Sequence, residues 1–412
     1  MSNAGYILVA LLAGLLLGVI GGTHAADHSA LLLPAVDTIG ALWLNSLRMT
    51  VVPLVVSLLI TGIAQTARAA RAGRLAVLSL SWIVAVMALS GLVGAFMTPL
   101  LLHLWPLPAE AAAALKSALG AAPPVAAPPP FAEFVKSIVP VNPFAAAVND
   151  AILPLIIFTG AFGFALTRLP EGPRDHLASI FSALADAMII IIGWVLKIAP
   201  IGVFALAFGV GVRSGGAAFG ALLHYVLILS SIGIAISLSA YAVGAIGGRI
   251  RLRDYARQVA PVQALAISTQ SSLACLPIML RKSQELGVHS STADVVLPMA
   301  VALMRATGPA MNFAVALYVA NLFGMTLVPS QIAIGVVICV LTSMSSVSLP
   351  GQVSFVTAIA PICLALGIPV APLALLLAVE TLPDIARTLG NAMMDLSVTC
   401  AIGRRDGIEE AA

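Results

Sequence analysis

The chain has 412 residues, of which 60% are hydrophobic and only 9% are charged. Because about a quarter of the residues in soluble domains are charged, this composition excludes an ordinary soluble protein. It indicates that the protein lies in a lipid bilayer. The formal net charge of +3 is too small to predict a nucleic-acid partner. The four cysteines lie in apolar stretches without ligand-like spacing, so neither a disulfide framework nor a cysteine-based metal site is predicted.

The first part of the chain contains six apolar segments that predict transmembrane helices. They cover residues 5–22, 38–66, 75–105, 131–168, 174–212 and 217–247. No basic region precedes the first segment and many spans follow it, so we interpret it as a retained helix rather than a signal peptide. The fourth is interrupted at Pro140 and Pro143. The Pro/Ala-rich stretch 106–130 predicts an extramembrane loop.

Two later apolar segments, 254–287 and 328–366, are each interrupted near the middle. The interruptions, Thr269–Pro277 and Ser343–Gly351, both carry Ser-Ser followed shortly by Leu-Pro. A repeated helix breaker inside apolar segments predicts two re-entrant helical hairpins. Irregular backbone at membrane depth is tolerated only where protein buries it or a cavity wets it. The hairpin tips are therefore expected at an internal site.

A full helix is predicted after each hairpin, over 290–324 and 369–404. The predicted fold class is thus an all-α integral membrane protein with eight transmembrane helices and two re-entrant hairpins in inverted repeats, an arrangement typical of transporters. Basic residues outside the spans partition to one side, which predicts that both termini are cytoplasmic. That side receives Arg68, Arg71, Arg74, Arg168, Arg174, Arg249, Arg251, Arg253, Arg257, Arg281, Lys282, Arg404 and Arg405, and the other receives Lys116, Lys136 and Arg213.

The last apolar segment carries a polar and charged stripe along one helix face. Its members are Glu380, Asp384, Arg387, Thr388, Asn391 and Asp395. At about 100° per residue they share a face roughly 100° wide. Ionised groups at membrane depth are costly unless they face a protein interior or a watery cavity, so the stripe predicts a transport pathway or ligand site. A structural cluster of ion pairs is the alternative.

With these motifs assembled, the chain resembles the dicarboxylate/amino acid:cation symporter family, the glutamate-transporter homologues. The likeness extends over nearly the whole length and includes MTVVPLVVSLLITGIA, VPVNPF (Val139–Phe144), APIGVFAL (Ala199–Leu206), both hairpin tips and DIARTLGNAMMD (Asp384–Asp395). The resemblance implies a homotrimer in the inner membrane that works by an elevator mechanism. It assigns residues 1–72 and 131–212 to a static scaffold, 73–105 and 213–412 to a moving transport domain, and 106–130 to an extracytoplasmic loop.

The resemblance also implies roles for the site residues. Arg387 would pair with the side-chain carboxylate of an acidic substrate, Asp384 and Thr388 would hold its amino group, and Asn391 would meet its α-carboxylate. Paired guanidinium donors suit a carboxylate, and helix N-termini at the tips suit an anion. The tip residues assigned to the substrate are Ser271, Ser272, Leu349, Pro350 and Gly351. Because plain dicarboxylates have no amino group for Asp384, aspartate or glutamate is preferred over succinate or malate.

One departure from the family concerns cations. Where sodium-coupled members carry Asn-Met-Asp-Gly-Thr, this chain has Met304–Gly308, and a family Thr-Ser pair aligns with Val86 and Met87. Sodium requires hard oxygen ligands, so one sodium site is predicted to be lost. We expect Arg305 to supply the missing positive charge, paired with Asp395, Glu380 or Asp384. A structural role for Arg305 is the alternative.

The coupling ion is left open. A residual sodium site at Asp395 and Asn391 is one option, and proton coupling through Glu380, Asp395 or His224 is another. The acidic residue of potassium- and proton-coupled relatives aligns with Asn312, which does not titrate. No cofactor is predicted. The sequence thus predicts an acidic amino acid transporter with lost or reduced sodium coupling, with a proton-coupled C4-dicarboxylate transporter as the alternative. An ion channel or intramembrane enzyme is disfavoured, because neither charge rings nor a nucleophile–base pair is evident.

Overall fold

The computed structural model describes residues 3–24, 26–70, 73–119, 136, 139–149, 151–214, 217–345 and 351–409. Every regular element in these ranges is a helix, which confirms the all-α class. Six helical stretches are long and apolar enough to cross a membrane. They are Gly5–His24, Leu31–Ala67, Arg74–Leu104, Glu171–Lys197, Phe219–Gly247 and Ser290–Leu322. The chain is therefore a multi-pass membrane protein.

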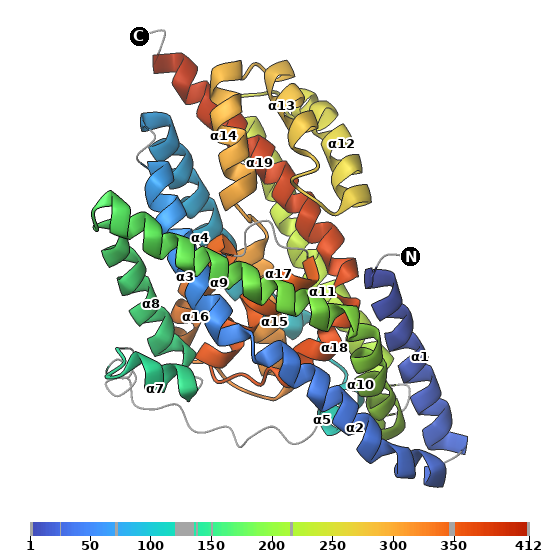
Figure 1. Ribbon diagram of the computed structural model, residues 1–412. Helices are drawn as coiled ribbons and strands as arrows, with labels where there is room; N and C mark the ends of the chain where they lie inside the picture. The colour runs from blue at the N-terminus through green and yellow to red at the C-terminus, as the bar shows by residue number, and fades with distance from the viewer. Residues whose placement is uncertain are drawn as a thin grey trace.

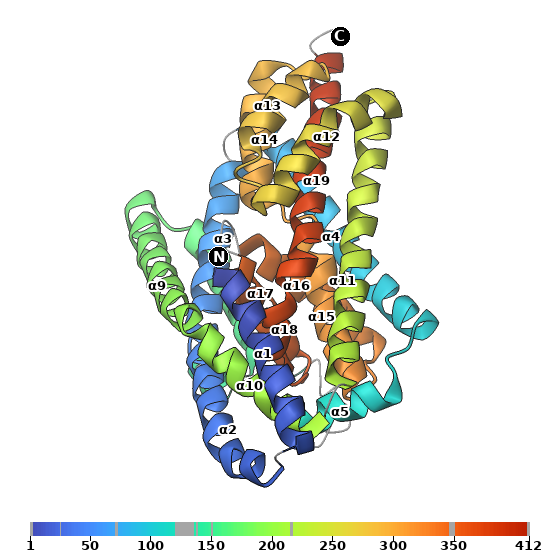
Figure 2. The same ribbon diagram turned by 90° about the vertical axis from the view of Figure 1, so that its right-hand side faces the viewer.

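One group of helices comes from the N-terminal half. It comprises α1 (Asn3–His24), α2 (Ala26–Arg48), α3 (Val51–Ala70), α7 (Pro143–Val148), α8 (Ile152–Thr167), α9 (Glu171–Lys197) and α10 (Ala199–Ser214). Helix α10 packs along α1 and α2, while α3 packs against α8 and α9 (Figures 1 and 2). A Cβ on Gly18 would lie 2.4 Å from the Phe208 carbonyl oxygen, so α1 and α10 meet backbone to backbone.

Two spans predicted as single helices in this group are each divided. The 38–66 segment turns at Met49 and Thr50, between α2 and α3, and the 174–212 segment breaks at Ile198, between α9 and α10. Pro53 and Pro200 lie in the first turns of α3 and α10. Proline is tolerated there because the first N–H groups of a helix have no intrahelical partner, whereas it disrupts a helix interior.

The segment 106–130, predicted as a loop, contains a helix near its start. Helix α5 (Ala109–Leu119) packs against α10 and α11, so this part of the segment is ordered against the helix bundle. Residues 120–130 lie outside the described part of the chain. After it, Asn142 caps α7 by accepting a hydrogen bond from the backbone N–H of Phe144 at 2.9 Å.

The second group of helices surrounds the C-terminal helix. It comprises α4 (Arg74–Leu104), α11 (Ala217–Ala242), the π-helical turn η1 (Val243–Gly247), α12 (Leu252–Thr269), α13 (Leu276–Glu285), α14 (Ser290–Leu303), α15 (Gly308–Leu322), α16 (Pro329–Ser345), α17 (Gly351–Ala365), α18 (Ala371–Val379) and α19 (Thr381–Glu409). Helix α19, red in Figures 1 and 2, runs through the middle and packs against α11, α12 and α14.

Two helix pairs occupy the positions of the predicted hairpins. Helices α12 and α13 pack against each other, and the chain reverses through a turn that begins at Gln270, whose φ of 50° is left-handed. This pair lies near the end of the molecule where the chain terminates, whereas α16 and α17 lie in the opposite half (Figures 1 and 2). Both pairs dip into the protein from opposite ends, as inverted repeats require.

The spans that follow the hairpins differ from the prediction in their continuity. The 290–324 segment unwinds over 304–307, and the 369–404 segment changes direction at Glu380. Each break lies just N-terminal to a proline, Pro309 or Pro383. The ring of a proline clashes with the carbonyl four residues earlier in a continuous helix. That clash would fall on Arg305 and Val379, which explains where both helices are interrupted.

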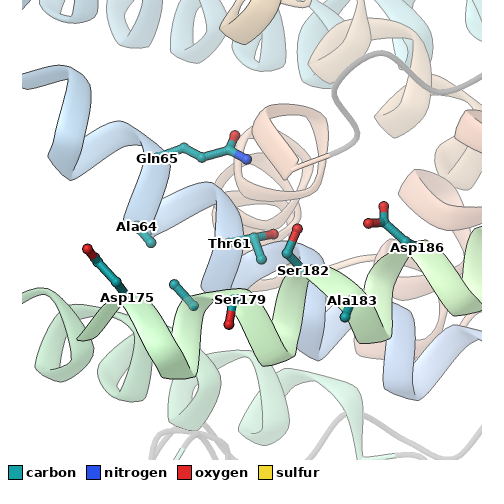
Figure 3. A pocket seen from close by; sticks show the side chains of 9 residues that line it. Thr61, Ala64, Gln65, Asp175, Ser179, Ser182, Ala183 and Asp186 are labelled. Carbon is teal, nitrogen blue, oxygen red and sulfur yellow. The ribbon is translucent and has the colours of Figure 1, made fainter. Parts of the chain in front are cut away.

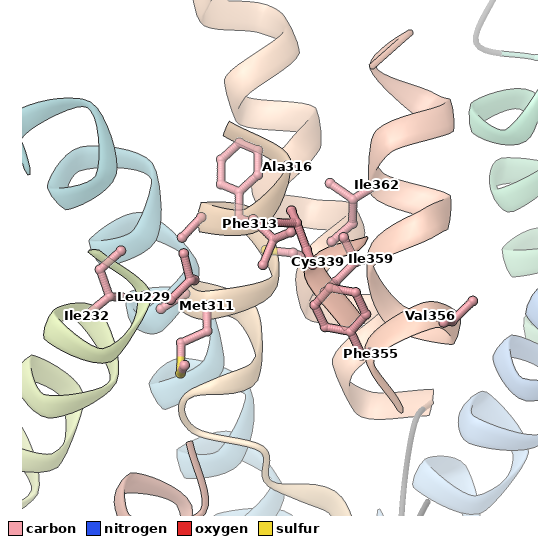
Figure 4. Close-up of a cluster of buried hydrophobic side chains, with 14 of the residues drawn as sticks. Leu229, Ile232, Met311, Phe313, Ala316, Cys339, Phe355, Val356, Ile359 and Ile362 are labelled. Atoms are coloured by element: carbon pink, nitrogen blue, oxygen red, sulfur yellow. The ribbon is translucent and has the colours of Figure 1, made fainter. Parts of the chain in front are cut away.

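Helix α15 lies at the centre of the apolar core. Fourteen of its fifteen residues are buried. The ring of Phe313 of α15 packs against Gly335 of α16, where an added Cβ would lie 2.4 Å from it, while Met311 faces α11 (Figure 4). Because this helix is surrounded on all sides, a polar residue on it requires a partner inside the protein.

Candidate functional site

The polar face of α19 points into the protein. Glu380 is 2% exposed, Asn391 is 2% exposed and Asp395 is fully buried. Thr388 is also buried, while Asp384 and Arg387 are partly buried. Helix α19 positions all of them except Glu380, which lies at the junction of α18 and α19. The stripe is therefore an interior feature and not a surface pattern.

Arg387 lies at the centre of a charged and polar cluster. Its Nη2 donates to Oε1 of Glu380 at 2.6 Å, and its Nη1 donates to Oδ1 of Asn312 at 2.8 Å. Its Nε lies 3.5 Å from Oδ1 of Asp384. All three nitrogens of the guanidinium thus face acceptors within the protein. Asp384 is thus ion-paired with Arg387, and Arg305 also lies within electrostatic range of it.

Two neighbouring helices complete this cluster. Tyr225 of α11 donates its hydroxyl to Oε2 of Glu380 at 3.0 Å, so both carboxylate oxygens of Glu380 are hydrogen-bonded. Asn312 of α15 accepts from Arg387 and donates its Nδ2 to Oγ of Ser343 at 3.2 Å. Because Ser343 belongs to α16 of the second hairpin, the guanidinium is linked to that hairpin through one side chain.

The unwound segment between α14 and α15 is tied to α19. Thr307 donates its backbone N–H to Oδ1 of Asn391 at 2.9 Å. Its hydroxyl lies 2.8 Å from the same oxygen and 2.9 Å from the carbonyl oxygen of Arg387, and shares its single proton between them. The carbonyl side of the Asn391 amide is thus used internally, which leaves its NH₂ as the donor side for a ligand.

The other end of the polar face is not satisfied in this way. Neither carboxylate oxygen of Asp395 has a hydrogen-bond partner among the described residues, although the residue is fully buried. Arg305, in the unwound segment, lies within electrostatic range of Asp395 and Asp384. Its Nε is also buried without a partner in the described part of the chain. Arg305 faces these carboxylates without a direct ion pair to Glu380.

No strong cation site is evident in the residues that the structure describes. They contain no group of three or more His, Cys, Asp or Glu side chains that could hold a metal ion. Val86 and Met87 of α4 are buried and offer no side-chain oxygen. Met304 and Ala306 are likewise buried and apolar. Within the described residues, the carboxylate of Asp395, buried without a hydrogen-bond partner, could accept a small cation or a proton.

The hairpin tips are only partly described. In the first tip, Ser271 accepts a hydrogen bond from the backbone N–H of Ala274 at 3.3 Å. Ser272 is buried and its hydroxyl has no partner among the described residues. Cys275, at the end of this tip, lies within electrostatic range of Asp395. In the second tip, Gly351 begins α17, and Leu349 and Pro350 lie outside the described residues.

His224, a proton candidate from the sequence, lies beside the cluster but does not join it. Its Nε2 lies 2.9 Å from the carbonyl oxygen of Trp105, and its Nδ1 lies 3.1 Å from the hydroxyl of Tyr318. Tyr318 in turn donates to the carbonyl oxygen of Ala221 at 3.0 Å. Both ring nitrogens of His224 therefore have hydrogen-bond partners outside the cluster around Arg387.

A separate polar cavity of about 370 Å³ lies between α3 and α9. It is lined by Thr61, Ala64, Gln65, Asp175, Ala178, Ser179, Ser182, Ala183 and Asp186. Figure 3 shows Thr61 of α3 beside Ser182 of α9. None of the sequence-predicted site residues lines this cavity, so it is distinct from the cluster around Arg387.

Sequence reasoning missed three residues of the cluster, Tyr225, Thr307 and Asn312. Tyr225 is fully buried in an apolar helix. A lone tyrosine hydroxyl in such a helix needs an internal acceptor, and this was the available signal. Thr307 gave no such signal, because its role depends on the unwinding of the helix around it. Asn312 was noted in the sequence only as a position that does not titrate.

A multi-pass helical protein with two opposed hairpins and a buried face of opposite charges belongs to the class of secondary membrane transporters, and not to the enzymes. The model of the sodium:dicarboxylate symporter family matches residues 5–405, so the chain belongs to this family. Its relatives include the proton/glutamate-aspartate symporter of Escherichia coli, with 27% identity over 96% of this chain and 92% of the relative. Both the family resemblance and the transporter prediction are confirmed.

Two further relatives show the range of substrates. The proton/sodium-glutamate symport protein of Bacillus subtilis is 26% identical over 96% of this chain and 91% of its own length. C4-dicarboxylate transport protein 3 of Ralstonia nicotianae is 26% identical over 99% of this chain and 93% of its own length. These names include both an acidic amino acid and a dicarboxylate as transported substrate, and both sodium and protons as coupling ions.

Proposed function

We propose that this protein is an inner-membrane transporter that binds aspartate or glutamate at Arg387 and Asp384, with lost or reduced sodium coupling. The observation that carries the proposal is the 3.5 Å approach of the Arg387 guanidinium to the Asp384 carboxylate on one buried helix face. An acidic amino acid carries carboxylates and an ammonium group. Neighbouring donors and acceptors of opposite charge complement such a ligand.

The remaining site residues fit this substrate. Asn391 holds its carbonyl oxygen toward Thr307 and so presents its NH₂ to the α-carboxylate. Thr388 and the first-tip residues Ser271 and Ser272 are also proposed to contact the substrate. Leu349, Pro350 and Gly351 are the residues expected to contact it from the second tip. The unpartnered hydroxyl of Ser272 supports a ligand-facing role for the first tip.

Arg305 is proposed to replace a bound sodium ion. Support comes from the electrostatic interaction of Arg305 with both Asp395, which is fully buried, and Asp384, which is partly buried, because its permanent charge offsets these carboxylates. Buried apolar side chains at Val86, Met87 and Met304 provide none of the oxygen ligands that a hard cation needs. A residual sodium ion at Asp395 and Asn391 is the competing proposal, favoured by the orphaned oxygens of Asp395.

The transport cycle is proposed to be an elevator movement within a homotrimer, with both termini in the cytoplasm. The two groups of helices described above support a scaffold of residues 1–72 and 131–212 and a transport domain of 73–105 and 213–412. The orientation is supported by basic residues at the α11–α12 junction and near the ends of α13 and α19, which gather at one end of the molecule (Figure 1).

A C4-dicarboxylate is the second candidate substrate, because relatives that carry that name match the chain almost from end to end. Radiolabelled aspartate, glutamate and succinate should be offered to proteoliposomes that contain the purified protein, with sodium and proton gradients imposed separately. The proposal expects aspartate or glutamate uptake that persists without sodium. Uptake of succinate alone would favour the second candidate, and uptake that collapses without sodium would contradict the role of Arg305.

A further inference from the structure

The two arginines of the site, Arg387 and Arg305, differ in how their guanidinium groups are engaged. All three nitrogens of Arg387 face acceptors on other side chains of the protein. Arg305 makes no hydrogen bond and no direct ion pair with any described residue, and its Nε is buried. A guanidinium carries five N–H donors, and a buried donor without a partner is costly. Arg305 therefore retains a hydrogen-bonding capacity that an incoming acceptor can use.

The unwound segment between α14 and α15 determines where Arg305 lies. Thr307, two residues further along the chain, donates its backbone N–H to Oδ1 of Asn391 in α19 at 2.9 Å. A Cβ added to Gly308 would lie 3.1 Å from Cβ of Arg305 and 3.0 Å from Oγ of Ser343 in α16. The side chain of Arg305 therefore starts from backbone that contacts both α19 and the second hairpin.

Asn391 is the second residue of this segment's surroundings with an unused donor. Its Oδ1 is held by Thr307, whereas its Nδ2 makes no hydrogen bond with any described residue. An amide NH₂ and a guanidinium both act only as donors, so neither can satisfy the other. One neutral and one cationic donor, tethered to each other through Thr307, complement a carboxylate, because a carboxylate acts only as an acceptor.

We propose that Arg305 binds the α-carboxylate of the substrate together with Asn391, and so selects ligands that carry an anion at that position. The inference rests on the proposed function, in which Arg387 takes the side-chain carboxylate and Asp384 takes the ammonium group. Each carboxylate of the acidic amino acid then has an arginine of its own. Asn391 follows Arg387 by four residues, about one helical turn, so the two anchors serve the two ends of one small molecule.

The charges of the site support a ligand with two anionic groups. Arg305 lies within electrostatic range of Arg387. Two like charges near each other inside a protein repel more strongly than in water, because the effective dielectric constant is lower there. A carboxylate at each guanidinium offsets this repulsion. A neutral group in place of the α-carboxylate would leave the charge of Arg305 without this compensation.

Compensation of Asp395 does not by itself account for the geometry of Arg305. Both carboxylate oxygens of Asp395 and Nε of Arg305 are buried without a partner among the described residues, although the two groups interact electrostatically. A guanidinium that served only this carboxylate would be expected to form the direct, paired contact that suits both groups. Because Arg305 acts on Asp395 at longer range, its donors are left for a ligand.

The test compares two ligands by calorimetric titration of the full-length protein. Aspartate carries the α-carboxylate, whereas its α-amide, isoasparagine, keeps the ammonium group and the side-chain carboxylate but is neutral at that position. Wild-type protein is expected to bind aspartate about 10- to 150-fold more tightly than isoasparagine, which is measured by displacement of aspartate. In Arg305→Gln this ratio should fall by about tenfold or more, because only aspartate loses a charge-assisted pair.

Arg305→Lys gives an independent readout if Arg305→Gln does not fold. This variant keeps the positive charge near Asp395 but loses the paired donors. Aspartate affinity should therefore fall by about three- to tenfold, while isoasparagine affinity changes little. Arg281→Gln is the matched control, because it alters an exposed arginine of the first hairpin and should keep the wild-type ratio.

The outcomes separate this inference from the proposed function. Equal losses for both ligands in Arg305→Gln, or a wild-type ratio in Arg305→Lys, would overturn the inference while aspartate binding stands. Arg305 would then act only on carboxylates of the protein itself. Wild-type protein that binds neither aspartate nor glutamate would instead refute the proposed function.

Discussion

The two ends of the polar face of α19 differ in how their charges are compensated. Around Arg387, the guanidinium and both oxygens of Glu380 have partners within hydrogen-bond distance. Around Asp395, neither carboxylate oxygen has a described partner, and the nearest cation, Arg305, acts at longer range. At the first end, all contacts are satisfied, and a ligand must displace at least one of them. At the second end, the buried carboxylate of Asp395 has no hydrogen-bond donor among the described residues.

The two ends of the face therefore raise different questions. At the first end, we propose that the substrate carboxylate displaces an internal partner of the Arg387 guanidinium. At the second end, we propose that Arg305 offsets part of the charge of Asp395 without a mobile ion. The following variants test each end of the face in turn.

The largest effect is expected from Arg387→Ala. Removing one partner of a buried charge pair costs about 2–5 kcal/mol, which corresponds to a loss of aspartate affinity between about 30-fold and 4,000-fold. Isothermal titration of aspartate measures the change. Arg387→Lys retains the charge without the paired donors and should fall between this variant and wild type. Arg281→Ala, at an exposed arginine, should bind normally. Unchanged affinity in Arg387→Ala would remove the site assignment.

The Asp395 end is tested by Arg305→Gln. We expect aspartate uptake to fall by about tenfold or more, because the carboxylate of Asp395 is left buried without a compensating charge. The double variant Arg305→Gln/Asp395→Asn should recover part of the loss, since both charges are then removed. Uptake into proteoliposomes with and without sodium gives the readout. Strictly additive losses would argue that the two residues do not act together.

A smaller and more selective effect is expected from Asp384→Asn. The variant retains the size of the side chain but loses the charge assigned to the substrate ammonium. Aspartate uptake should fall by about tenfold, corresponding to about 1.4 kcal/mol, while succinate uptake falls less. Competition between the two labelled substrates in the same vesicles measures the ratio. Equal losses for both would remove the argument for an amino acid.

The smallest effect is expected from Thr307→Val, which removes the hydroxyl that Asn391 and the Arg387 carbonyl share. A hydrogen bond of this kind contributes about 1 kcal/mol. Aspartate affinity should therefore decrease by about fivefold, and the Tm should fall by a few degrees. Thr23→Val serves as the control, because Thr23 is exposed and bonds only locally through its hydroxyl. Equal effects of both substitutions would contradict a role for Thr307 in positioning Asn391.

Much of the fold was predictable because its signals are local. Apolar length located the spans, and the repeated Ser-Ser and Leu-Pro breakers located both helix pairs. The breaks at Met304–Thr307 and Glu380 were missed, since both segments are long enough to be taken as single spans despite Pro309 and Pro383. A proline inside an apolar run is tolerated in membrane helices, so its presence alone does not locate a break.

The site was predictable only where its residues share one helix. Spacing placed Glu380, Asp384, Arg387, Thr388, Asn391 and Asp395 on one face. Spacing along one helix does not reveal which residues of other helices face it. The contacts of Tyr225 with Glu380, and of Asn312 with Arg387 and Ser343, could therefore not be predicted. The pairing of Arg387 with Glu380 also required coordinates, because several carboxylates along the stripe compete for the same guanidinium.

The three contacts of Thr307 carry a consequence for how the carrier resets. They fasten the unwound segment, and with it Arg305, to the same helix that holds Arg387 and Asn391. A sodium ion departs into the cytosol before an empty carrier turns around, but a tethered guanidinium travels back with it. In the proposed transporter, this positive charge and the carboxylates of Asp384 and Asp395 therefore travel together in both directions, so the empty carrier does not return with those carboxylates left without a cation.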